Sequence, residues 1–345
     1  MELMELACNG LKTICLREIN LSYKGFKSSI LPIDIGVPQG SILGPALFLI
    51  YINDMFKSID SGSLLLFADD ATHHDSDKNY DTLRIRINRN LKRISEWLLA
   101  NKLAVNIIKT EGMLFSRRYL YFPLNPISLA SNPIPFNYSI KFLGIFLDFR
   151  LSWKKHLMHI QSKLSSLCGI LYRLRNTISR NTARTIYLGI GLPYLNYGSI
   201  AWGSCSVSLL NSLSITQKKI VRNIMKKSRR EHSNPLFAEL KLLKLTDIIK
   251  VNSVMFIYKS LNNLIASPIS FLPQVIGPYN LRHQGHLQVP FTRSGQTQRF
   301  IHIRGSLLWN ELPIHIRNAN TIYAFKSRIK KYYLESYSDV GNNVR

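Results

Sequence analysis

The sequence predicts an α+β first part, residues 1–150, followed by a mainly helical second part. In the first part, short apolar runs bounded by turn residues stand beside one amphipathic helical pattern. After about Leu151 the apolar residues keep a helical period over more than five turns. The charge changes at the same place, because residues 1–150 hold 17 basic and 14 acidic residues, whereas residues 151–345 hold 28 basic and 6 acidic residues. We therefore expect a domain boundary near residue 150.

The elements of the first part follow from local patterns. Residues 63–67 form a short apolar run that ends at Asp69 and Asp70, as expected for a buried strand entering a tight turn. Apolar residues then recur at spacings of four and three from Tyr80 to near Asn101, which predicts an amphipathic helix. Further β-rich pieces are expected at residues 103–108, 113–115 and 139–147, with a Pro-rich turn region before the last of them.

The second part is expected to be built mainly from helices. The strongest helical pattern begins at Trp153 and continues through Leu157, Ile160, Leu164, Leu167, Leu171 and Leu174. Further helices are expected at residues 182–192, 209–227 and 246–261, and a basic amphipathic helix at residues 324–337. Residues 267–302 have loop-like and strand-like patterns with scattered Pro and Gly.

The composition predicts a folded protein with a polyanionic partner. Hydrophobic residues make up 46% of the chain and charged residues 19%, which excludes an intrinsically disordered protein. The formal net charge is +25 and the isoelectric point is near 10.0. Such an excess favours nucleic acid as the partner, while a ribosomal-type assembly and an anionic membrane surface are the alternatives that charge alone leaves open.

Cysteine usage and hydropathy bear on the cellular compartment. The four cysteines, Cys8, Cys15, Cys168 and Cys205, have no CxxC spacing, so neither a zinc site nor a disulfide framework is expected. The N-terminus lacks the pattern of a secretory signal, and the longest apolar run, residues 42–52, is too short to span a bilayer. We expect a soluble intracellular protein of the nucleus and cytoplasm that has no membrane partner.

The sharpest chemical feature is the pair Asp69-Asp70 at the end of the apolar run. Adjacent carboxylates repel each other unless a cation neutralises them, and oxygen ligands suit hard cations such as Mg²⁺. In two-metal phosphoryl transfer, carboxylates hold the ions that activate the attacking oxygen and stabilise the leaving one. A solvated Asp pair in an ordinary turn is the alternative interpretation.

A second motif lies about thirty residues upstream, at residues 36–41, with the sequence GVPQGS. Gly36 and Gly40 permit a loop in which the backbone approaches a ligand closely. Ser41 is placed to cap the apolar helix that follows, which leaves backbone N–H groups for a polar or anionic partner. An ordinary strand-to-helix turn is the alternative.

Together these motifs resemble the reverse transcriptases of LINE-type (non-LTR) retrotransposons, in the jockey-like group. The resemblance rests on GVPQGS at residues 36–41, ILGPALFLIYIND at residues 42–54 and LLLFADD at residues 64–70. Softer similarities occur at residues 102–110, 142–145, 151–156, 195–202 and 305–313, so that the likeness runs from about Tyr23 to Lys331. The function it implies is RNA-directed DNA synthesis, with nucleotidyl transfer from a dNTP to a primer 3′-OH.

The resemblance also implies roles for individual residues. Asp69 would be a catalytic ligand of Mg²⁺, with Mn²⁺ as the other suitable ion, and Asp70 would be the second ligand or an electrostatic support. Lys109 would protonate the leaving pyrophosphate, although a solvated surface lysine is the alternative. The loop contacting the template and the incoming nucleotide would contain Gly36, Gln39, Gly40 and Ser41.

The same resemblance implies surfaces for the primer and the duplex. Phe142, Leu143 and Gly144 would form the primer grip that positions the primer end. The helix after Trp153 would offer basic side chains to backbone phosphates, namely Lys154, Lys155, Lys163, Arg173 and Arg175. A plain bundle helix with a solvated basic face is the alternative for this segment.

At the level of domains, the resemblance implies a partial right-hand polymerase palm at residues 1–150, built from an antiparallel sheet with helices. A basic all-α thumb at residues 151–230 and a mixed, basic C-terminal extension at residues 231–345 would follow. The implied partners are an RNA template, a DNA primer and dNTPs.

The chain departs from the family before Gly36, where no aspartate stands in the expected strand-end context. We therefore expect an N-terminally truncated chain, with fingers, first palm strand and endonuclease supplied upstream in a full-length element. The isolated chain is expected to be inactive. The alternative function is that of a truncated, non-catalytic nucleic-acid-binding remnant.

Overall fold

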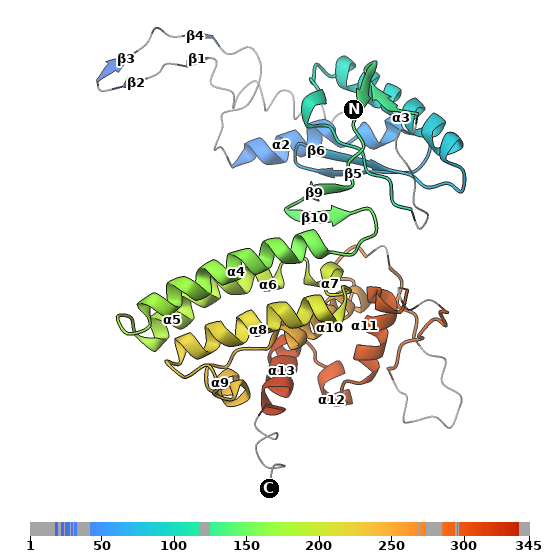
Figure 1. The fold of residues 1–345 in the computed structure, drawn as a ribbon. Helices are drawn as coiled ribbons and strands as arrows, with labels where there is room; N and C mark the ends of the chain where they lie inside the picture. The colour runs from blue at the N-terminus through green and yellow to red at the C-terminus, as the bar shows by residue number, and fades with distance from the viewer. Residues whose placement is uncertain are drawn as a thin grey trace. The chain divides into compact units, whose positions relative to one another are not determined.

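The chain forms two compact units. The computed structural model describes residues 42–116, 125–267, 269–273, 285–293, 295 and 297–337, together with short pieces between residues 18 and 32. Unit 1 comprises the described residues of Met1–Leu114 and Arg118–Asn137, and unit 2 those of Phe115–Arg117 and Tyr138–Arg345. Figure 1 identifies the elements of each unit.

Unit 1 combines helices with antiparallel strand pairs, as the sequence predicted. Its helices are α2 (Leu43–Ile52), the 3₁₀ turns η1 (Met55–Ser58) and η2 (Ile107–Lys109), and α3 (Tyr80–Ala100). Its strand pairs are β1 (Glu18–Ile19) with β4 (Leu31–Pro32), β2 (Ser22–Tyr23) with β3 (Phe26–Lys27), β5 (Ser63–Phe67) with β6 (Asp70–His74), and β7 (Ile127–Leu129) with β8 (Asn132–Ile134). Each of these described sheets has two strands.

Helix α3 matches the helix predicted from the apolar period. It begins at an N-cap, Asn79, whose side chain accepts a hydrogen bond of 2.8 Å from the N–H of Asp81. Leu83 and Ile94 are buried on its inner face. Strand β7 packs against the helix, where the N–H of Ser128 donates to Oδ1 of Asn88 at 2.9 Å.

Two predicted β-rich pieces of unit 1 are wrong. Residues 103–108 contain no strand, and Ile107–Lys109 forms a 3₁₀ turn in which the side chain of Asn106 accepts from the N–H of Lys109 at 3.2 Å. This local bond offers the backbone an alternative to pairing in a sheet. Residues 113–115 also form no strand, and beside them Gly112 makes an isolated bridge to Phe136.

Among its described residues, unit 2 has a hairpin followed mainly by helices, with one isolated bridge between Pro273 and Leu287. The hairpin pairs β9 (Ser139–Phe142) with β10 (Ile145–Asp148). The helices that follow are α4 (Lys154–Leu174), α5 (Arg180–Ile186), the π segment η3 (Tyr187–Gly191), α6 (Leu192–Asn196), α7 (Ser199–Trp202), α8 (Val207–Ile224), α9 (Ser233–Glu239), α10 (Leu245–Leu261), the 3₁₀ turn η5 (Thr297–Arg299), α11 (Ile301–Asn310), α12 (Ile314–Arg317) and α13 (Ile322–Glu335). The helices predicted at residues 182–192, 209–227, 246–261 and 324–337 are present with shifted ends.

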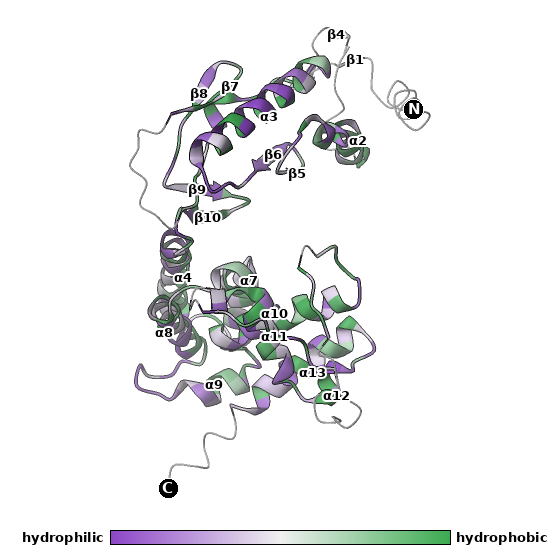
Figure 2. Cartoon of the chain, turned by 90° about the vertical axis from the view of Figure 1, so that its right-hand side faces the viewer, coloured by the Kyte–Doolittle hydropathy of each residue, from purple (hydrophilic) through white to green (hydrophobic). Residues whose placement is uncertain are grey.

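Two hydrophobic cores support unit 2, and α10 takes part in both. The first joins α4, α8 and α9, and α10 contributes Leu245 and Ile248 to it. The second joins α10 to α11, α12 and α13, and receives Val254 and Ile257. In Figure 2 hydrophobic residues gather where α7, α10 and α11 meet, whereas α3 of unit 1 is mostly hydrophilic. Within the described residues, no helix has both the length and the apolarity of a membrane span.

Candidate active site and nucleic-acid surfaces

The paired carboxylates lie at the tip of the β5–β6 hairpin. Phe67 pairs with Asp70 across the two strands, so that Ala68 and Asp69 form the two-residue turn. Ala68 has a φ of +50°, a left-handed conformation that is rare for a residue other than glycine. Both Asp69 and Asp70 are exposed. The hairpin therefore presents two adjacent carboxylates to solvent.

The two faces of this hairpin have different surroundings. Leu64 and Leu66 are half-buried, on the face that carries His73 and meets α3. Leu65 and Phe67 point the other way and are 53% and 64% exposed. The prediction of a buried strand is thus correct for one face only, because Leu65 and Phe67 on the second face remain largely exposed.

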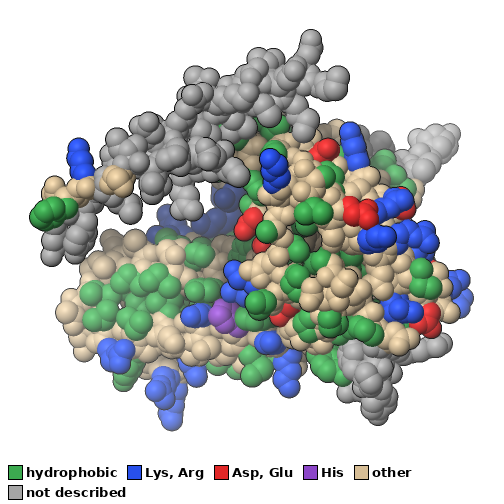
Figure 3. All heavy atoms as spheres, turned by 90° about the horizontal axis from the view of Figure 1, so that it is seen from above, with side chains coloured by type: hydrophobic (Ala, Val, Ile, Leu, Met, Phe, Trp, Pro, Cys, Tyr) green, Lys and Arg blue, Asp and Glu red, His purple; other side chains and the backbone are tan. Residues whose placement is uncertain are grey.

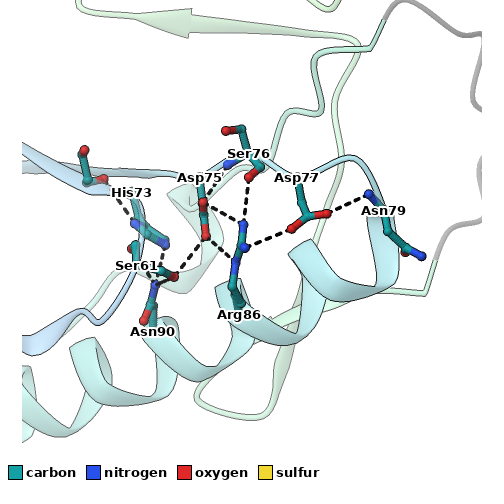
Figure 4. A network of polar contacts seen from close by, with 9 residues as sticks. Ser61, His73, Asp75, Ser76, Asp77, Asn79, Arg86 and Asn90 are labelled. Carbon is teal, nitrogen blue, oxygen red and sulfur yellow. Dashed lines mark hydrogen bonds and ion pairs between the residues drawn. The ribbon is translucent and has the colours of Figure 1, made fainter.

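A polar network fastens the open end of the hairpin to α3 (Figure 4). The amide nitrogen of Asn90, a residue 1% exposed, donates to the carbonyl oxygen of Ser61 at 2.9 Å and to Nε2 of His73 at 3.1 Å. Asp75 receives two hydrogen bonds of 3.0 Å from the guanidinium of Arg86, and the hydroxyl of Ser61 donates to it at 3.1 Å. These bonds fix one end of the hairpin, about 13 Å along the strands from its tip.

The network perturbs two titratable groups. Burial lowers the pKa of His73 below 6.5, and its hydrogen bond with Ser63 and the charge of Asp75 only partly oppose this. Burial alone would raise the pKa of Asp75, but hydrogen bonds from Ser76, Ser61 and Arg86 bring it below its ordinary value. We therefore expect a neutral His73 and an ionised Asp75 at neutral pH. Sequence reasoning missed this network, because its members belong to no motif.

The carboxylate pair by itself does not complete a two-metal centre. Among the described residues, no three side chains of His, Cys, Asp or Glu are grouped closely enough to hold a metal ion. Mg²⁺ requires near-octahedral oxygen coordination, of which Asp69 and Asp70 would supply only part. Four acidic residues precede residue 36, namely Glu2, Glu5, Glu18 and Asp34. Glu2, Glu5 and Asp34 lie outside the described residues, and only the backbone of Glu18, in β1, is described.

Two other predicted parts of the active site are Lys109 and the template loop. Lys109 is exposed at the end of the η2 turn, and within the described residues no ion pair or hydrogen bond joins its side chain to Asp69 or Asp70. The template loop residues Gly36, Gln39, Gly40 and Ser41 lie outside the described residues. The apolar helix predicted after this loop is α2, which has Ile42 as its N-cap residue.

The predicted primer-grip segment is a hairpin turn instead of one continuous strand. Phe142 pairs with Ile145, and Leu143 and Gly144 form the two-residue turn between β9 and β10. Their φ values are +44° and +83°, and positive φ at both central residues is typical of a type I′ hairpin turn. The prediction of one strand over residues 139–147 is therefore wrong, because Gly144 permits a reversal that an apolar pattern does not reveal.

Tyr197 holds this turn against the helical part of unit 2. Its hydroxyl donates a hydrogen bond of 2.5 Å to the carbonyl oxygen of Leu143. The next residue, Gly198, has a φ of +62° and lies so close to Ile145 that a Cβ would stand 2.3 Å from its Cδ1. Two segments about fifty residues apart, which the sequence offered as separate similarities, are therefore in direct contact.

The junction between the hairpin and α4 is held by Asp148. Its carboxylate oxygens accept hydrogen bonds from the N–H of Ser152 at 2.9 Å and from the N–H of Trp153 at 2.8 Å. Leu151 and Trp153 have φ values of +51° and +65°, so this carboxylate stabilises a tightly turned segment. The turn sets where α4 begins relative to the hairpin.

The predicted phosphate-binding residues of α4 do not form one row. Lys154, Lys155 and Lys163 are exposed, and at 3.6 residues per turn they spread over about half of the helix circumference. Arg173 shares the direction of Lys155 but lies about 27 Å farther along the axis. Arg175 is half-buried, with its guanidinium 5.2 Å from the ring centre of Tyr172. On the face drawn in Figure 3, Lys and Arg side chains are likewise scattered among other side chains.

Comparison with known proteins identifies the relatives of the chain. Residues 5–147 match the family described as "Reverse transcriptase (RNA-dependent DNA polymerase)". The "RNA-directed DNA polymerase from mobile element jockey" of Drosophila melanogaster is 30% identical over 241 residues, which cover 67% of this chain and 26% of that protein.

Two further relatives extend this comparison. The "Probable RNA-directed DNA polymerase from transposon X-element" of Drosophila melanogaster is 30% identical over 225 residues, 63% of this chain and 25% of the relative. The "Retrovirus-related Pol polyprotein from type-1 retrotransposable element R1" of Bradysia coprophila is 26% identical over 183 residues, 51% of this chain and 18% of the relative. The chain spans about a quarter or less of the length of these relatives.

Proposed function

Because residues 5–147 belong to the reverse transcriptase family and the chain is related to RNA-directed DNA polymerases of jockey-like, non-LTR retrotransposons, we propose that it forms the part of such an enzyme that carries the paired carboxylates. The reaction is nucleotidyl transfer from a dNTP to the 3′-OH of a DNA primer on an RNA template. The proposal rests on one observation above all, the exposure of Asp69 and Asp70 at the tip of a hairpin anchored at its other end.

The paired carboxylates would bind the divalent cation, Mg²⁺ or Mn²⁺, that polymerases of this kind use. When bound, such ions stabilise the charge that develops on the transferred phosphoryl group. Asp69 and Asp70 provide two ligands, so a complete centre needs oxygen ligands beyond the described residues. The chain's own contribution at this point is to hold both carboxylates in a short turn with little freedom to move apart.

The remaining assignments follow the same proposal. Lys109 would donate a proton to the pyrophosphate, and the loop of residues 36–41 would contact the template and the nucleotide. The turn at Leu143 and Gly144 would position the primer end, supported by Tyr197. Residues 1–150 would correspond to a palm, residues 151–230 to a thumb and residues 231–345 to a C-terminal extension. The five basic residues of α4 and its end would contact backbone phosphates individually, since they share no face.

A non-catalytic nucleic-acid-binding remnant is the second candidate function. It is favoured by the charge of residues 151–345, where 28 basic residues face 6 acidic ones. This function needs no metal and gives Asp69 and Asp70 no role in binding. It predicts binding of RNA or DNA that weakens steeply as salt rises, because binding of phosphates releases counterions.

Primer extension distinguishes the two functions. The 345-residue chain alone, with an RNA template, a DNA primer, dNTPs and Mg²⁺, is expected to give no detectable product. A chimera in which this chain replaces the matching segment of the Drosophila melanogaster jockey polymerase is expected to extend the primer. Asp69→Asn should abolish that extension, whereas Asp81→Asn, at an exposed carboxylate on α3, should preserve it.

The outcomes are decisive in both directions. A folded chimera that binds primer–template but extends nothing would contradict the polymerase function and favour the remnant. Extension that survives Asp69→Asn would contradict the role given to the carboxylate pair. Robust Asp69-dependent extension by the 345-residue chain alone would contradict our expectation that it needs further ligands.

A further inference from the structure

Helix α13 carries an exposed row of one tyrosine and two lysines. Tyr323, Lys326 and Lys330 follow one another at spacings of three and four residues, which places them on one face of the helix. Tyr323 is 83% exposed and both lysines are exposed as well. Phe325 and Ile329, on a neighbouring face, are fully buried in the second core. The helix is thus held firmly while this row faces solvent.

Two further basic residues from other elements lie beside this row. Arg184 of α5 donates a hydrogen bond of 2.9 Å from Nε to the carbonyl oxygen of Leu240, the residue before Lys241. Helices α9 and α13 are in contact and are drawn as neighbours in Figure 1. Lys241, which follows α9, and Arg184 are both close enough for their charges to act on Lys330. We name Arg184, Lys241, Lys326 and Lys330 the cation cluster.

Three members of the cation cluster act electrostatically on the fourth, Lys330. Partial burial lowers the pKa of Lys330, and the positive charges of the other three members lower it further. None of the charged groups that act on Lys330 is acidic. By contrast, Lys331 on the same helix is paired with Glu335, with Nζ and Oε1 3.7 Å apart. A polyanion should bind more favourably to a group of neighbouring cations than to scattered lysines.

We propose that the cation cluster and Tyr323 form a binding site for single-stranded RNA, with backbone phosphates on the four cations and a base stacked on the tyrosine ring. Basic grooves combined with exposed aromatic rings are the usual means of binding single strands, because every unpaired base has a face free to stack. The phosphates of a duplex could contact the cations, but its paired bases would not be free to stack on the ring of Tyr323. The inference rests on the proposed function, which requires an RNA template strand.

The cation cluster is tested by the salt dependence of RNA binding. Fluorescence anisotropy with a fluorescein-labelled 20-nucleotide uridine RNA measures the affinity of the full chain between about 50 and 300 mM NaCl. Over this range of salt, the affinity of a protein that contacts phosphates changes strongly. The double variant Lys326→Gln with Lys330→Gln should bind about tenfold more weakly near 100 mM salt. Its slope of log affinity against log salt should be shallower by about 1.4, since each single-strand phosphate contact contributes about 0.7.

A matched control removes two lysines that are already ion-paired. Lys92 lies 3.9 Å from Glu96 and Lys331 lies 3.7 Å from Glu335, both pairs exposed on helices. The double variant Lys92→Gln with Lys331→Gln changes the net charge equally and should leave the slope nearly unchanged. Equal slopes for the two double variants, with circular dichroism showing both folded, would overturn the cation cluster.

The stacking partner is tested separately. Tyr323→Ala should weaken RNA binding about tenfold without changing the salt slope, and Tyr323→Phe should restore it, because stacking needs the ring and not the hydroxyl. Tyr332→Ala is the control, at a residue 39% exposed and on a different face of the same helix. An unchanged affinity in Tyr323→Ala would overturn the stacking.

The failure of this inference differs from a failure of the proposed function. Wild-type chain that binds RNA while the cluster variant keeps its salt slope would contradict the cation cluster alone. Wild-type chain that binds no RNA at low salt would contradict both the cluster and the nucleic-acid function. Loss of primer extension in the chimera, with the RNA-binding slopes as expected, would contradict the polymerase function and leave the RNA site in place.

Discussion

The amide nitrogen of Asn90 on α3 and Nε2 of His73 on β6 lie 3.1 Å apart and share a hydrogen bond. Nδ1 of His73 lies 3.2 Å from the carbonyl oxygen of Ser63, which accepts only, so Nδ1 carries the proton. Nε2 must therefore accept from Asn90. A proton on Nε2 would make it a second donor that faces the amide N–H of Asn90, with no acceptor between them. This arrangement therefore requires a neutral imidazole.

The neutral His73 predicts an acid-labile contribution to stability. Its folded-state pKa is lowered from 6.5, mainly by burial, so the unfolded chain binds a proton that the folded chain rejects. This contribution is fully present above about pH 6.5 and is lost as the pH falls below that value. Urea denaturation between pH 7.5 and pH 5, a range of about 2.5 units around this pKa, should show a smaller pH dependence in His73→Gln.

His74→Gln is the control for that measurement. His74 is the next residue on β6, and its side chain is exposed. The His74→Gln variant should keep the wild-type pH dependence of the free energy of unfolding. An identical pH dependence in all three proteins would show that His73 is not the titrating group.

Removal of the Asn90 side chain should destabilise unit 1 strongly. Asn90→Ala leaves the carbonyl oxygen of Ser61, the N–H of Asp60 and Nε2 of His73 without their partner. Buried polar groups that lose a partner cost about 1–3 kcal/mol each at most, so we expect a loss of about 2–4 kcal/mol in the free energy of unfolding. Arg89→Ala, exposed on the same helix, should stay within about 0.5 kcal/mol of wild type.

Two glycine substitutions should act in opposite directions. Gly144→Ala places a Cβ on a residue with a φ of +83° in the β9–β10 turn and should destabilise unit 2 by about 1–2 kcal/mol. Gly169 is an exposed residue of α4 whose added Cβ would meet nothing within 4 Å, so Gly169→Ala should stabilise by about 0.5–1 kcal/mol. Thermal unfolding of both variants tests the prediction, and a stabilising Gly144→Ala would refute the left-handed turn.

Gln217 should be the most sensitive polar residue of the first core of unit 2. Its amide nitrogen donates to the hydroxyl of Tyr187 at 2.9 Å and to the carbonyl oxygen of Leu243 at 3.0 Å, and its oxygen accepts from the N–H of Leu245 at 2.8 Å. Gln217→Leu keeps a similar volume but leaves three buried groups unpaired, so we expect a loss of about 2–4 kcal/mol. Gln288→Leu, at an exposed position, is the control and should change the free energy of unfolding by less than about 0.5 kcal/mol.

The helices were largely predictable because their apolar residues repeat over many turns. The pattern from Trp153 to Leu174 coincides with the buried face of α4, and the pattern from Tyr80 coincides with that of α3. Helix α11 was not predicted, since its ten residues interrupt the apolar pattern with Gly305 and Ser306, both of which are buried by close packing.

The short strands were predicted less well. An apolar run such as residues 139–147 has the same composition whether it continues or reverses, and the reversal depends on the positive φ of Leu143 and Gly144. The turn that contains Asp69 was foreseen from the polar pair that ends the apolar run. The catalytic roles of that pair, of Lys109 and of the loop at residues 36–41 remain predictions.

The cation cluster could not be foreseen, since its members are separated by up to about 150 positions in the sequence and meet only through tertiary packing.

The continuity of α10 through both cores of unit 2 has a consequence for how that unit opens. Because the two halves of α10 are buried in different cores, loss of this helix would disrupt both, and we expect the two cores to open together. Amide protons of α10 should then be among the slowest in unit 2 to exchange with solvent. A ligand held on α13 would slow exchange in α4 as well, although α4 lies in the other core, because ligand binding raises the free energy of opening of the whole cooperative unit.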